Sequence, residues 1–270
     1  MAALLTLWAG WMLARAEVAM AAASAACALF VRSVMPGLFP YLVVVQLLLS
    51  RVKLRHGWQL MLLGWAGGSP TGARLLSAAP GDRRRLAVRC ATMSPMFLLG
   101  TLGQWLGNPM AAGWIFLSVL LGGYLAGFLA PSEAPRAAAG TDAAPLRFGD
   151  AVESGARTML AVCGTMVMMR VLAALVGEAL GPWPRLQLIV MALLEVTTGA
   201  QAVAQLPLPL ALRGALLAGL TGFGGAAIML QNRAFYPRDL LSLPRQLFCQ
   251  SAHALLSFLI ALGGLYLGAG

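Results

Sequence analysis

The stretch from Trp58 to Ala79 (WQLMLLGWAGGSPTGARLLSAA) constrains this chain most, because it is apolar enough to enter a membrane but is interrupted at its centre. The interruption contains Gly67, Gly68, Ser69, Pro70 and Gly72. Each apolar arm has about ten residues, and at about 1.5 Å per residue a helical arm covers only half of a hydrocarbon core about 30 Å thick. The stretch is therefore either a kinked span or a re-entrant hairpin.

Basic residues on both sides of this stretch distinguish the two alternatives. Arg51, Lys53 and Arg55 precede it, and a cluster from Arg83 to Arg89 follows it. Because cytoplasmic loops of membrane proteins are enriched in Lys and Arg, a full crossing would leave one cluster on the wrong side. The charges therefore predict a re-entrant hairpin. Its non-helical centre needs polar partners at membrane depth, which predicts a binding site there.

The composition of the whole chain is that of a polytopic membrane protein. Of the 270 residues, 60% are hydrophobic and only 10% are charged, which excludes an ordinary soluble domain. The net charge is +10, and most of the 19 Lys and Arg residues fall in four loops: 51–57, 80–89, 131–157 and 232–246. This distribution predicts that these loops are cytoplasmic and that the lipid bilayer is a partner. Nucleic acid is excluded as a partner, because no basic stripe is interleaved with aromatic residues.

Catalytic and metal-binding patterns are missing from the sequence. The four cysteines, Cys27, Cys90, Cys163 and Cys249, are isolated, without CxxC or Cys/His spacing, and are typical of small buried apolar residues. No GxSxG, HExxH, Walker A or GxGxxG context is present. The sequence therefore predicts no enzyme activity, no metal ion and no cofactor.

The apolar segments predict an all-α fold made of spans, hairpins and interfacial helices. Spans are expected at residues 33–50, 89–106, 111–130, 158–180, 209–231 and 246–267. A second re-entrant hairpin is expected at 186–206, and interfacial helices at 16–32 and 147–157. Further breaks are expected at Thr92, Ser94 and Pro95, at Thr197 to Gly199, and at Thr221 to Gly225.

A shift of 127 residues superposes the two halves of the chain and defines its domains. The shift places Thr71-Gly72-Ala73 on Thr198-Gly199-Ala200 and hairpin on hairpin. An odd number of crossings in each half gives the halves opposite orientations, which is the inverted-repeat plan of many transporters. The alternative is a bundle of ordinary spans with Gly-rich packing kinks. The predicted domains are an N-terminal membrane segment with interfacial helix (1–32), repeat 1 (33–130), a cytoplasmic linker (131–149) and repeat 2 (150–270).

Six segments, spread over about residues 30 to 268, resemble signature segments of the sporulation integral membrane protein family (YlbJ-type), whose members contain a nucleoside recognition (Gate) domain. They are VMPGLFPYLVVVQLL, GGSPTGARL, TMSPMFLLG, FGDAVESGARTML, LLEVTTGAQ and GFGGAAIMLQ. The resemblance implies a bacterial inner-membrane protein that acts in sporulation and is similar to parts of concentrative nucleoside transporters. One departure is Arg74, in GSPTGAR, where the pattern of the family leads us to expect Asn-Pro and a Lys.

Glu195 is the only acid placed well inside an apolar segment, and it lies beside a predicted break. An ionisable group there is costly and by default indicates function, as a proton or cation site or as a hydrogen-bond acceptor for a solute. The alternative is a structural ion pair with Arg74 or with Arg170, which lies in the middle of a span. Arg74 could instead hold an anionic group of a solute.

Neutral polar side chains cluster around the four breaks. Singly, each is expected to cap a broken helix, but together they predict a polar cavity. The predicted substrate-binding residues are Glu195, Thr197, Thr198, Gln201, Ser69, Thr71, Arg74, Ser94, Gln231 and Asn232.

These observations lead to two functional hypotheses. The first is an inner-membrane transport or gating protein for a small polar solute, nucleoside-like or anionic, with H⁺ or Na⁺ as a candidate coupling ion and a homo-oligomer as a candidate assembly. The second is a non-transporting scaffold needed for assembly of the spore envelope, which would act through the linker 131–149.

Overall fold

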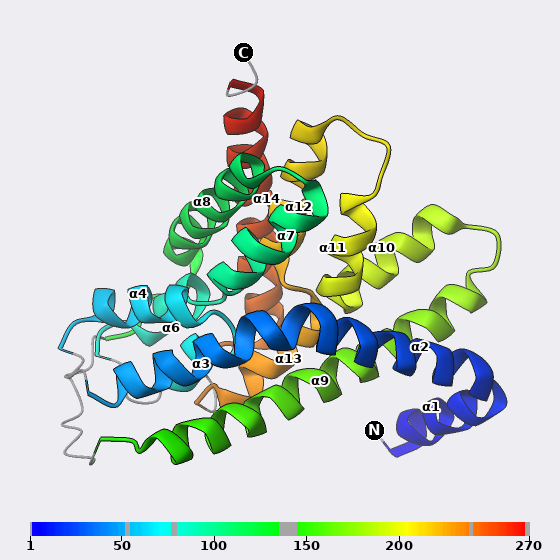
Figure 1. Cartoon of the computed structure of the whole chain (residues 1–270), viewed down its shortest axis with the longest axis horizontal. Helices are drawn as coiled ribbons and strands as arrows, with labels where there is room; N and C mark the ends of the chain where they lie inside the picture. Colours follow the sequence, from blue (N-terminus) through cyan, green and yellow to red (C-terminus); the bar gives the residue numbers. More distant parts are fainter. Residues whose placement is uncertain (1, 52–54, 77–79, 135–144, 238–239, 268–270) are drawn as a thin grey trace.

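The computed structural model describes residues 2–51, 55–76, 80–134, 145–237 and 240–267. Every secondary-structure element within these ranges is a helix, and none is a strand (Figure 1). Five of the helices are long and apolar enough to cross a membrane: Ala16–Leu48, Pro109–Leu129, Phe148–Ala179, Leu210–Phe235 and Leu243–Leu267. The prediction of an all-α polytopic membrane protein is therefore confirmed.

The first half of the chain contains a terminal helix, a long helix, a hairpin, a broken helix and a second long helix. Helix α1 (Ala2–Ala14) precedes the first long helix, which joins α2 (Ala16–Leu29), the π-helical turn η1 (Phe30–Val34) and α3 (Met35–Leu49). The hairpin consists of α4 (Gly57–Gly67) and α5 (Thr71–Leu75). The broken helix and second long helix follow as α6 (Arg83–Arg89), η3 (Met96–Thr101), α7 (Leu102–Leu106), α8 (Pro109–Ala126) and η4 (Gly127–Leu129).

The second half contains elements of the same kinds in the same order. A long helix, α9 (Phe148–Ala179), is followed by a hairpin of α10 (Pro184–Leu194) and α11 (Val196–Ala204). A broken helix and a last long helix then follow as α12 (Leu210–Phe223), α13 (Gly225–Phe235) and α14 (Leu243–Leu267).

The expected interfacial helices, residues 16–32 and 147–157, are not separate elements. The first is continuous with the span that follows it, and the second is the start of α9. Pro36 has no N–H to bond the carbonyl of Arg32, and the wider π-helical turn η1 accommodates this loss without ending the helix. We expected a helix boundary where each polar stretch gives way to an apolar span, but a change in polarity alone does not end a helix.

The expected span at 89–106 is also different. Residues 90–94 are not helical, so the apolar helix covers only Met96–Leu106 and is too short to cross a membrane by itself. The interruption lies at the predicted break, where Pro95 disfavours helical backbone in Ser94. The sequence therefore predicted the position of the break but overestimated the helix around it.

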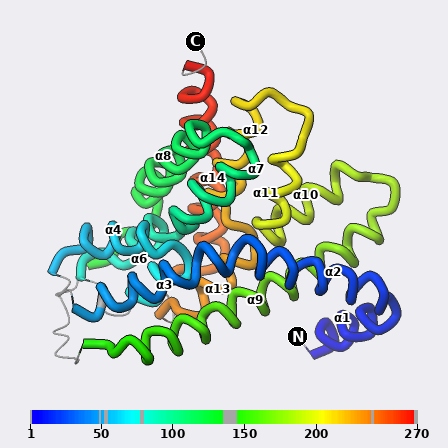
Figure 2. Tube along the Cα trace, in the orientation of Figure 1, coloured from blue at the N-terminus to red at the C-terminus, as the bar shows by residue number. Residues whose placement is uncertain are grey.

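Two groups of helices form the body of the molecule (Figure 1 and Figure 2). The helix α2–α3 packs antiparallel to α9, and α8, α12 and α14 pack together. Glycines bring α8 and α14 close, since a Cβ added at Gly122 would lie 2.3 Å from the Ser257 Oγ. His253 of α14 bonds through Nε2 to the Val119 carbonyl of α8 at 2.8 Å. The hairpins and broken helices connect the groups, because α13 contacts α9 while α11 contacts α12.

Basic segments gather at one end of the molecule. The end of α3 and the starts of α4 and α9 lie on one side, and the turns before α8, α10 and α12 lie on the other (Figure 1). Arg83 of α6 pairs with Glu133, which follows α8, at 2.7 Å. The Tyr236 hydroxyl, just after α13, donates to the Ala87 carbonyl of α6 at 3.4 Å. Segments that are far apart in sequence thus bring their positive charge to the same end.

Candidate functional site

The tip of the first hairpin packs against the interruption between α6 and η3. The backbone N–H of Ser69 donates to the Thr92 carbonyl at 2.7 Å, so two non-helical segments satisfy each other. Gly68 has φ +64°, and a Cβ there would lie 2.4 Å from the backbone nitrogen of Ser94. Only glycine fits this position, because both the backbone conformation and the close approach exclude a side chain.

The two arms of this hairpin fold back on each other around Cys90. A Cβ at Gly64 of α4 would lie 2.7 Å from the Cys90 Sγ, and one at Gly72 of α5 would lie 2.7 Å from the Cys90 Cβ. Cys90 is buried, as expected for a small apolar residue. The predicted helix–break–helix form of residues 58–79 is confirmed for its described part, and α4 spans about half of a bilayer core by its length.

The tip of the second hairpin is built on Glu195. Its extended backbone ends α10, and its carboxylate accepts from the backbone N–H groups of Thr197 at 2.9 Å and Thr198 at 2.7 Å. The side chain is therefore the N-cap of α11, placed where the helix dipole favours negative charge. The chain breaks at Glu195, two residues before the predicted break, and Thr197 and Thr198 form the first turn of α11.

The α12–α13 break packs against this second tip. Gly224 and Gly225 have φ +78° and +70°, and a Cβ at Gly225 would lie 3.2 Å from the Leu193 carbonyl and 3.3 Å from the Val196 nitrogen. The predicted break at Thr221 to Gly225 is confirmed. In each half, the tip of the hairpin thus contacts the interruption of the following helix.

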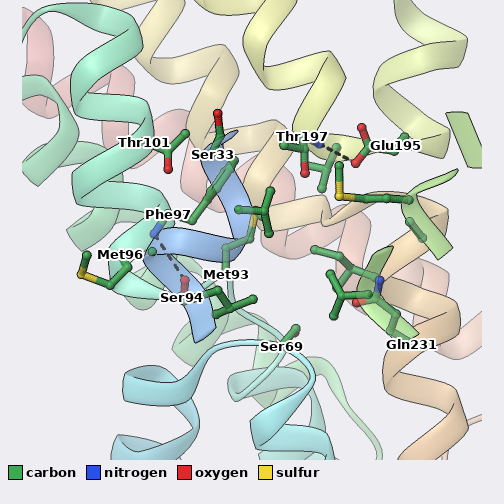
Figure 3. Close-up of a pocket in the computed structure, with 18 residues that line it drawn as sticks. Ser33, Ser69, Met93, Ser94, Met96, Phe97, Thr101, Glu195, Thr197 and Gln231 are labelled. Atoms are coloured by element: carbon green, nitrogen blue, oxygen red, sulfur yellow. Dashed lines mark hydrogen bonds between the residues drawn. The ribbon is translucent and has the colours of Figure 1, made fainter. Parts of the chain in front are cut away.

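One cavity lies where these breaks meet (Figure 3). Its volume is about 50 Å³, which is room for more than one water-sized group. Ser69 and Ser94 reach it from the breaks of the first half, Glu195 and Thr197 from the second hairpin, and Gln231 from α13. The other lining residues come from α3, η1, η3, α9, α11, α13 and the break before η3: Ser33, Val34, Gly37, Leu38, Met93, Met96, Phe97, Thr101, Val162, Met166, Val196, Ala227 and Ile228.

The lining combines neutral hydrogen-bonding groups with a large apolar surface. Serine and threonine hydroxyls and the Gln231 amide supply donors and acceptors, and methionines with Phe97 supply the apolar part. Glu195 is the only ionisable side chain among the lining residues, and it is 1% exposed. A site of this kind suits a solute with both an apolar face and several hydrogen-bonding groups.

Three further predicted residues lie beside the cavity without lining it. Asn232 donates through Nδ2 to the Ser69 Oγ at 3.1 Å, which joins α13 to the first hairpin. Thr71 and Thr198 are buried in the first turns of α5 and α11, and their hydroxyl oxygens have no hydrogen-bond partner in the described part of the chain. Buried hydroxyls of this kind are normally satisfied by water or by a ligand.

Two predicted site residues lie elsewhere. Gln201 is exposed on α11, so its side chain is not in the cavity. Arg74 points to α9, where it donates to the Thr158 hydroxyl at 2.7 Å and to the Ser154 hydroxyl at 3.3 Å. Its guanidinium also lies 5.3 Å from the centre of the Phe235 ring. Arg74 therefore connects α5 to α9 and α13 instead of lining the cavity.

The predicted pairing of Glu195 with Arg74 is not among the ion pairs of the described residues. Among the charged groups, Glu195 acts electrostatically on Arg170 of α9, which is half-buried. Glu178, near the end of α9, is paired with Arg15, which precedes α2. Glu195 is therefore the acid that acts on Arg170.

Ser33 and Thr101 line the cavity but were not singled out from the sequence. Ser33 lies in η1 and Thr101 ends η3, the two π-helical turns. Such turns often occur at functional sites. Nothing in the sequence reveals a π-helical turn directly, although Pro36 and Pro95 were visible beside both segments.

Comparison with known proteins found no match to a family model, a curated protein or a solved structure. The resemblance to the sporulation integral membrane protein family therefore stays a prediction that depends on the six motifs alone.

Proposed function

We propose that this chain is a membrane transport or gating protein that binds a small polar solute between two inverted repeats. The observation that carries the proposal is the cavity, which is lined by side chains from three separate helix interruptions and from α13, which begins just after a fourth. Helix breaks at membrane depth are costly unless protein or a wet cavity satisfies the backbone, and several breaks gathered at one place are typical of a transport site.

The bounds of the helices support the repeat. A shift of 127 residues carries α4 (Gly57–Gly67) onto α10 (Pro184–Leu194) and places α5 within α11. The hairpin–break contacts recur as well, since Gly68 packs on Ser94 and Gly225 packs on Val196. In this proposal, α4–α5 enters from one side of the bilayer and α10–α11 from the other.

The distribution of charge supports a cytoplasmic orientation for the basic end. Arg51, Arg83, Arg147 and Arg233 follow or precede helices whose ends share that side of the molecule, and the turn before α8 at the opposite end has no charged residue. By the positive-inside rule, the proposed cytoplasmic segments include the described parts of loops 51–57, 80–89, 131–157 and 232–246.

The chemistry of the cavity favours a neutral solute over an anionic one. The carboxylate of Glu195 accepts from two backbone amides of α11, and no Lys or Arg is among the described residues that line the cavity. An anionic solute would therefore find no cationic side chain to pair with in a surrounding of low polarity. A nucleoside-like molecule, with a flat apolar face and several hydroxyls, matches the methionines, Phe97 and the neutral polar groups. The link to sporulation depends only on the motif resemblance.

A thermal-shift experiment with matched variants tests this proposal. Purified protein in detergent is heated with uridine, adenosine, uridine monophosphate or citrate. A probe present at about 100 times its Kd stabilises the folded state by about 2.7 kcal/mol. We expect stabilisation by a neutral nucleoside in the wild type and in Q201L, whose glutamine is exposed, but not in Q231L, whose glutamine lines the cavity.

Other outcomes of this experiment distinguish the alternatives. Stabilisation by citrate alone would favour the anionic solute. Equal loss of nucleoside stabilisation in Q201L and Q231L would contradict a site in this cavity. If no probe changes the melting temperature, and if scrambling residues 135–144 abolishes function, the scaffold hypothesis is favoured. The scrambled segment spares Glu133, which pairs with Arg83.

A further inference from the structure

Arg89, the last residue of α6, is held against the outer face of α8. Its guanidinium carbon lies 4.4 Å from the centre of the Tyr124 ring and 4.6 Å from that of the Phe128 ring. Its Nε donates to the Tyr124 carbonyl at 3.3 Å. The side chain crosses the helix at Gly127, where a Cβ would lie 2.6 Å from the Arg89 Cγ. The guanidinium is therefore preorganised by two aromatic rings and a carbonyl.

Among the residues that the structure describes, the other three arginines of α6 pair with two acids, Glu133 and Asp82. Arg83 lies 2.7 Å from a Glu133 oxygen, and Arg84 lies 3.5 Å from the other oxygen of the same carboxylate. Arg85 is 3.4 Å from Asp82, which also caps α6 by accepting from the Arg85 backbone. Four arginines and two acids leave this end of the molecule with excess positive charge.

The excess charge lies on one face of α6, where Arg85 and Arg89 are four residues apart. Like charges at this spacing repel each other. Both guanidinium groups lie over the same ring, at 6.0 Å and 4.6 Å from the centre of Phe128. Arg89 has no carboxylate within ion-pair distance in the described ranges of the chain. Two arginines thus lie at one aromatic ring, and Asp82 is the carboxylate beside Arg85 while Arg89 uses rings and a carbonyl. Their remaining N–H groups are suited to a phosphate.

The surface beside these arginines is apolar and exposed. Phe128 is 51% exposed, and Tyr124, Leu125, Leu121 and Leu129 are also exposed along the same part of α8 and η4. The helix α8 is one of the candidate spans, so this stripe faces acyl chains in a bilayer. A positive pair at the end of a lipid-facing stripe matches a molecule that has an anionic head and apolar chains.

We propose that α6 and the C-terminal part of α8 form a specific site for an anionic phospholipid. The phosphate binds between the guanidinium groups of Arg85 and Arg89, and an acyl chain lies along Leu121, Leu125 and Phe128. The rings of Tyr124 and Phe128 fix the direction of Arg89, which sets the depth of the headgroup. This site is independent of the solute cavity and stands whether or not a solute is transported.

Native mass spectrometry of the full chain in detergent tests the site. The protein is mixed with phosphatidylglycerol or with phosphatidylcholine of the same acyl chains. We expect the wild type to retain the first phosphatidylglycerol about thirtyfold better than R85Q/R89Q, because each of the two arginines contributes about 1 kcal/mol. Retention of phosphatidylcholine should not change.

A matched variant separates this site from general surface charge. R147Q/R157Q removes the same charge from exposed arginines of the basic end and should keep phosphatidylglycerol as the wild type does. Equal loss in both double variants would overturn the proposal. Inorganic phosphate at millimolar concentration should not displace the lipid, and displacement by phosphate would show an anion site that does not recognise lipid. If R85Q/R89Q does not fold, R85Q alone must show the loss, because Arg89, and not Arg85, packs across Gly127 of η4.

Discussion

The two hairpins make similar turns with different chemistry. The turn between α4 and α5 depends on Gly68, whose positive φ and missing side chain let the tip touch Ser94. The turn between α10 and α11 depends on Glu195, whose carboxylate caps the second arm. The two residues cannot be exchanged. A glycine has no side-chain acceptor to cap a helix, and a glutamate does not fit a left-handed backbone in close contact with another segment.

The hairpins also differ in how deeply they lie. Leu60, Gly64 and Gly67 of α4 are buried, whereas α10 has no buried residue and follows the edge of the molecule (Figure 1). The first arm of the first hairpin is thus fixed by a buried face, whereas the first arm of the second hairpin has none. A shared backbone plan does not imply shared energetics, and four comparisons of variants test this in order of expected effect.

The largest effect is expected from G68A. The new Cβ would lie 2.4 Å from the Ser94 nitrogen at φ +64°, so backbone must move, and we expect a loss of about 4 kcal/mol in the free energy of unfolding. Unfolding in SDS mixed micelles measures this value. G113A is the control, because nothing lies within 4 Å of a Cβ there. Similar stability of the two variants would show that the tip does not touch Ser94.

The difference in burial predicts that truncating a leucine of α4 and an isoleucine of α10 to alanine lowers the free energy of unfolding by different amounts. Leu60 of α4 is 0% exposed and Ile189 of α10 is 53% exposed. We expect L60A to lose about 3 kcal/mol through the cavity that it creates, and I189A to lose less than about 1 kcal/mol. The same unfolding assay compares them. A cost for I189A as large as that for L60A would mean that a partner or a second copy covers α10.

Removal of the carboxylate tests the second tip. E195A leaves the N–H groups of Thr197 and Thr198 without their acceptor, and we expect a loss of about 2 kcal/mol. E195Q should recover part of this, since its amide oxygen still accepts one bond. Hydrogen exchange of these two amides in nanodiscs is the second measurement. Unchanged protection in E195A would contradict capping.

The smallest change in the free energy of unfolding is expected from substitutions at the start of each hairpin. Gln59 Oε1 accepts from the backbone of Arg55 at 2.8 Å and of His56 at 3.0 Å, which forms a capping box at the start of α4. Gln187 of α10 only donates to the Gly181 carbonyl, at 2.7 Å. We expect Q59A to lose about 1 kcal/mol and Q187A to lose about half of that. The reverse order would indicate that α10 depends on its start more than on Glu195.

Local chemistry explains which parts of this fold could be predicted from the sequence. The breaks were visible because Gly68, Pro95 and Gly224 end helices through their own backbone preferences. The continuity of α2 through η1 was not visible, since it depends on how a helix absorbs Pro36. The orientation of each repeat in a membrane was inferred from charge and stays a prediction.

The site was predicted less completely for a different reason. Ser69, Ser94, Glu195 and Thr197 could be singled out because they lie at or next to breaks, whereas Gln231 lies within α13. Which face of an intact helix points inward depends on its neighbours, so the sequence did not reveal that Gln201, near a break, is on the exposed side of α11.

Arg74 shows a second limit of reasoning from charge. The expected pair with Glu195 assumed that opposite charges in an apolar region find each other. Glu195 instead uses the amides of its own helix, and Arg74 uses the hydroxyls of Thr158 and Ser154. Neutral partners that are close in space thus replace a distant charge, and a sequence does not reveal that distance.

The hydrogen bond from Ser69 to the Thr92 carbonyl has a mechanical consequence. The two non-helical segments satisfy each other's backbone hydrogen bonds. If one moved without the other, an N–H group and a carbonyl group would lose their partner in the hydrocarbon region. We expect the two segments to travel as a single rigid body. Any reshaping of the cavity must then come from the opposite wall, where α9 and the second hairpin supply Met166 and Glu195.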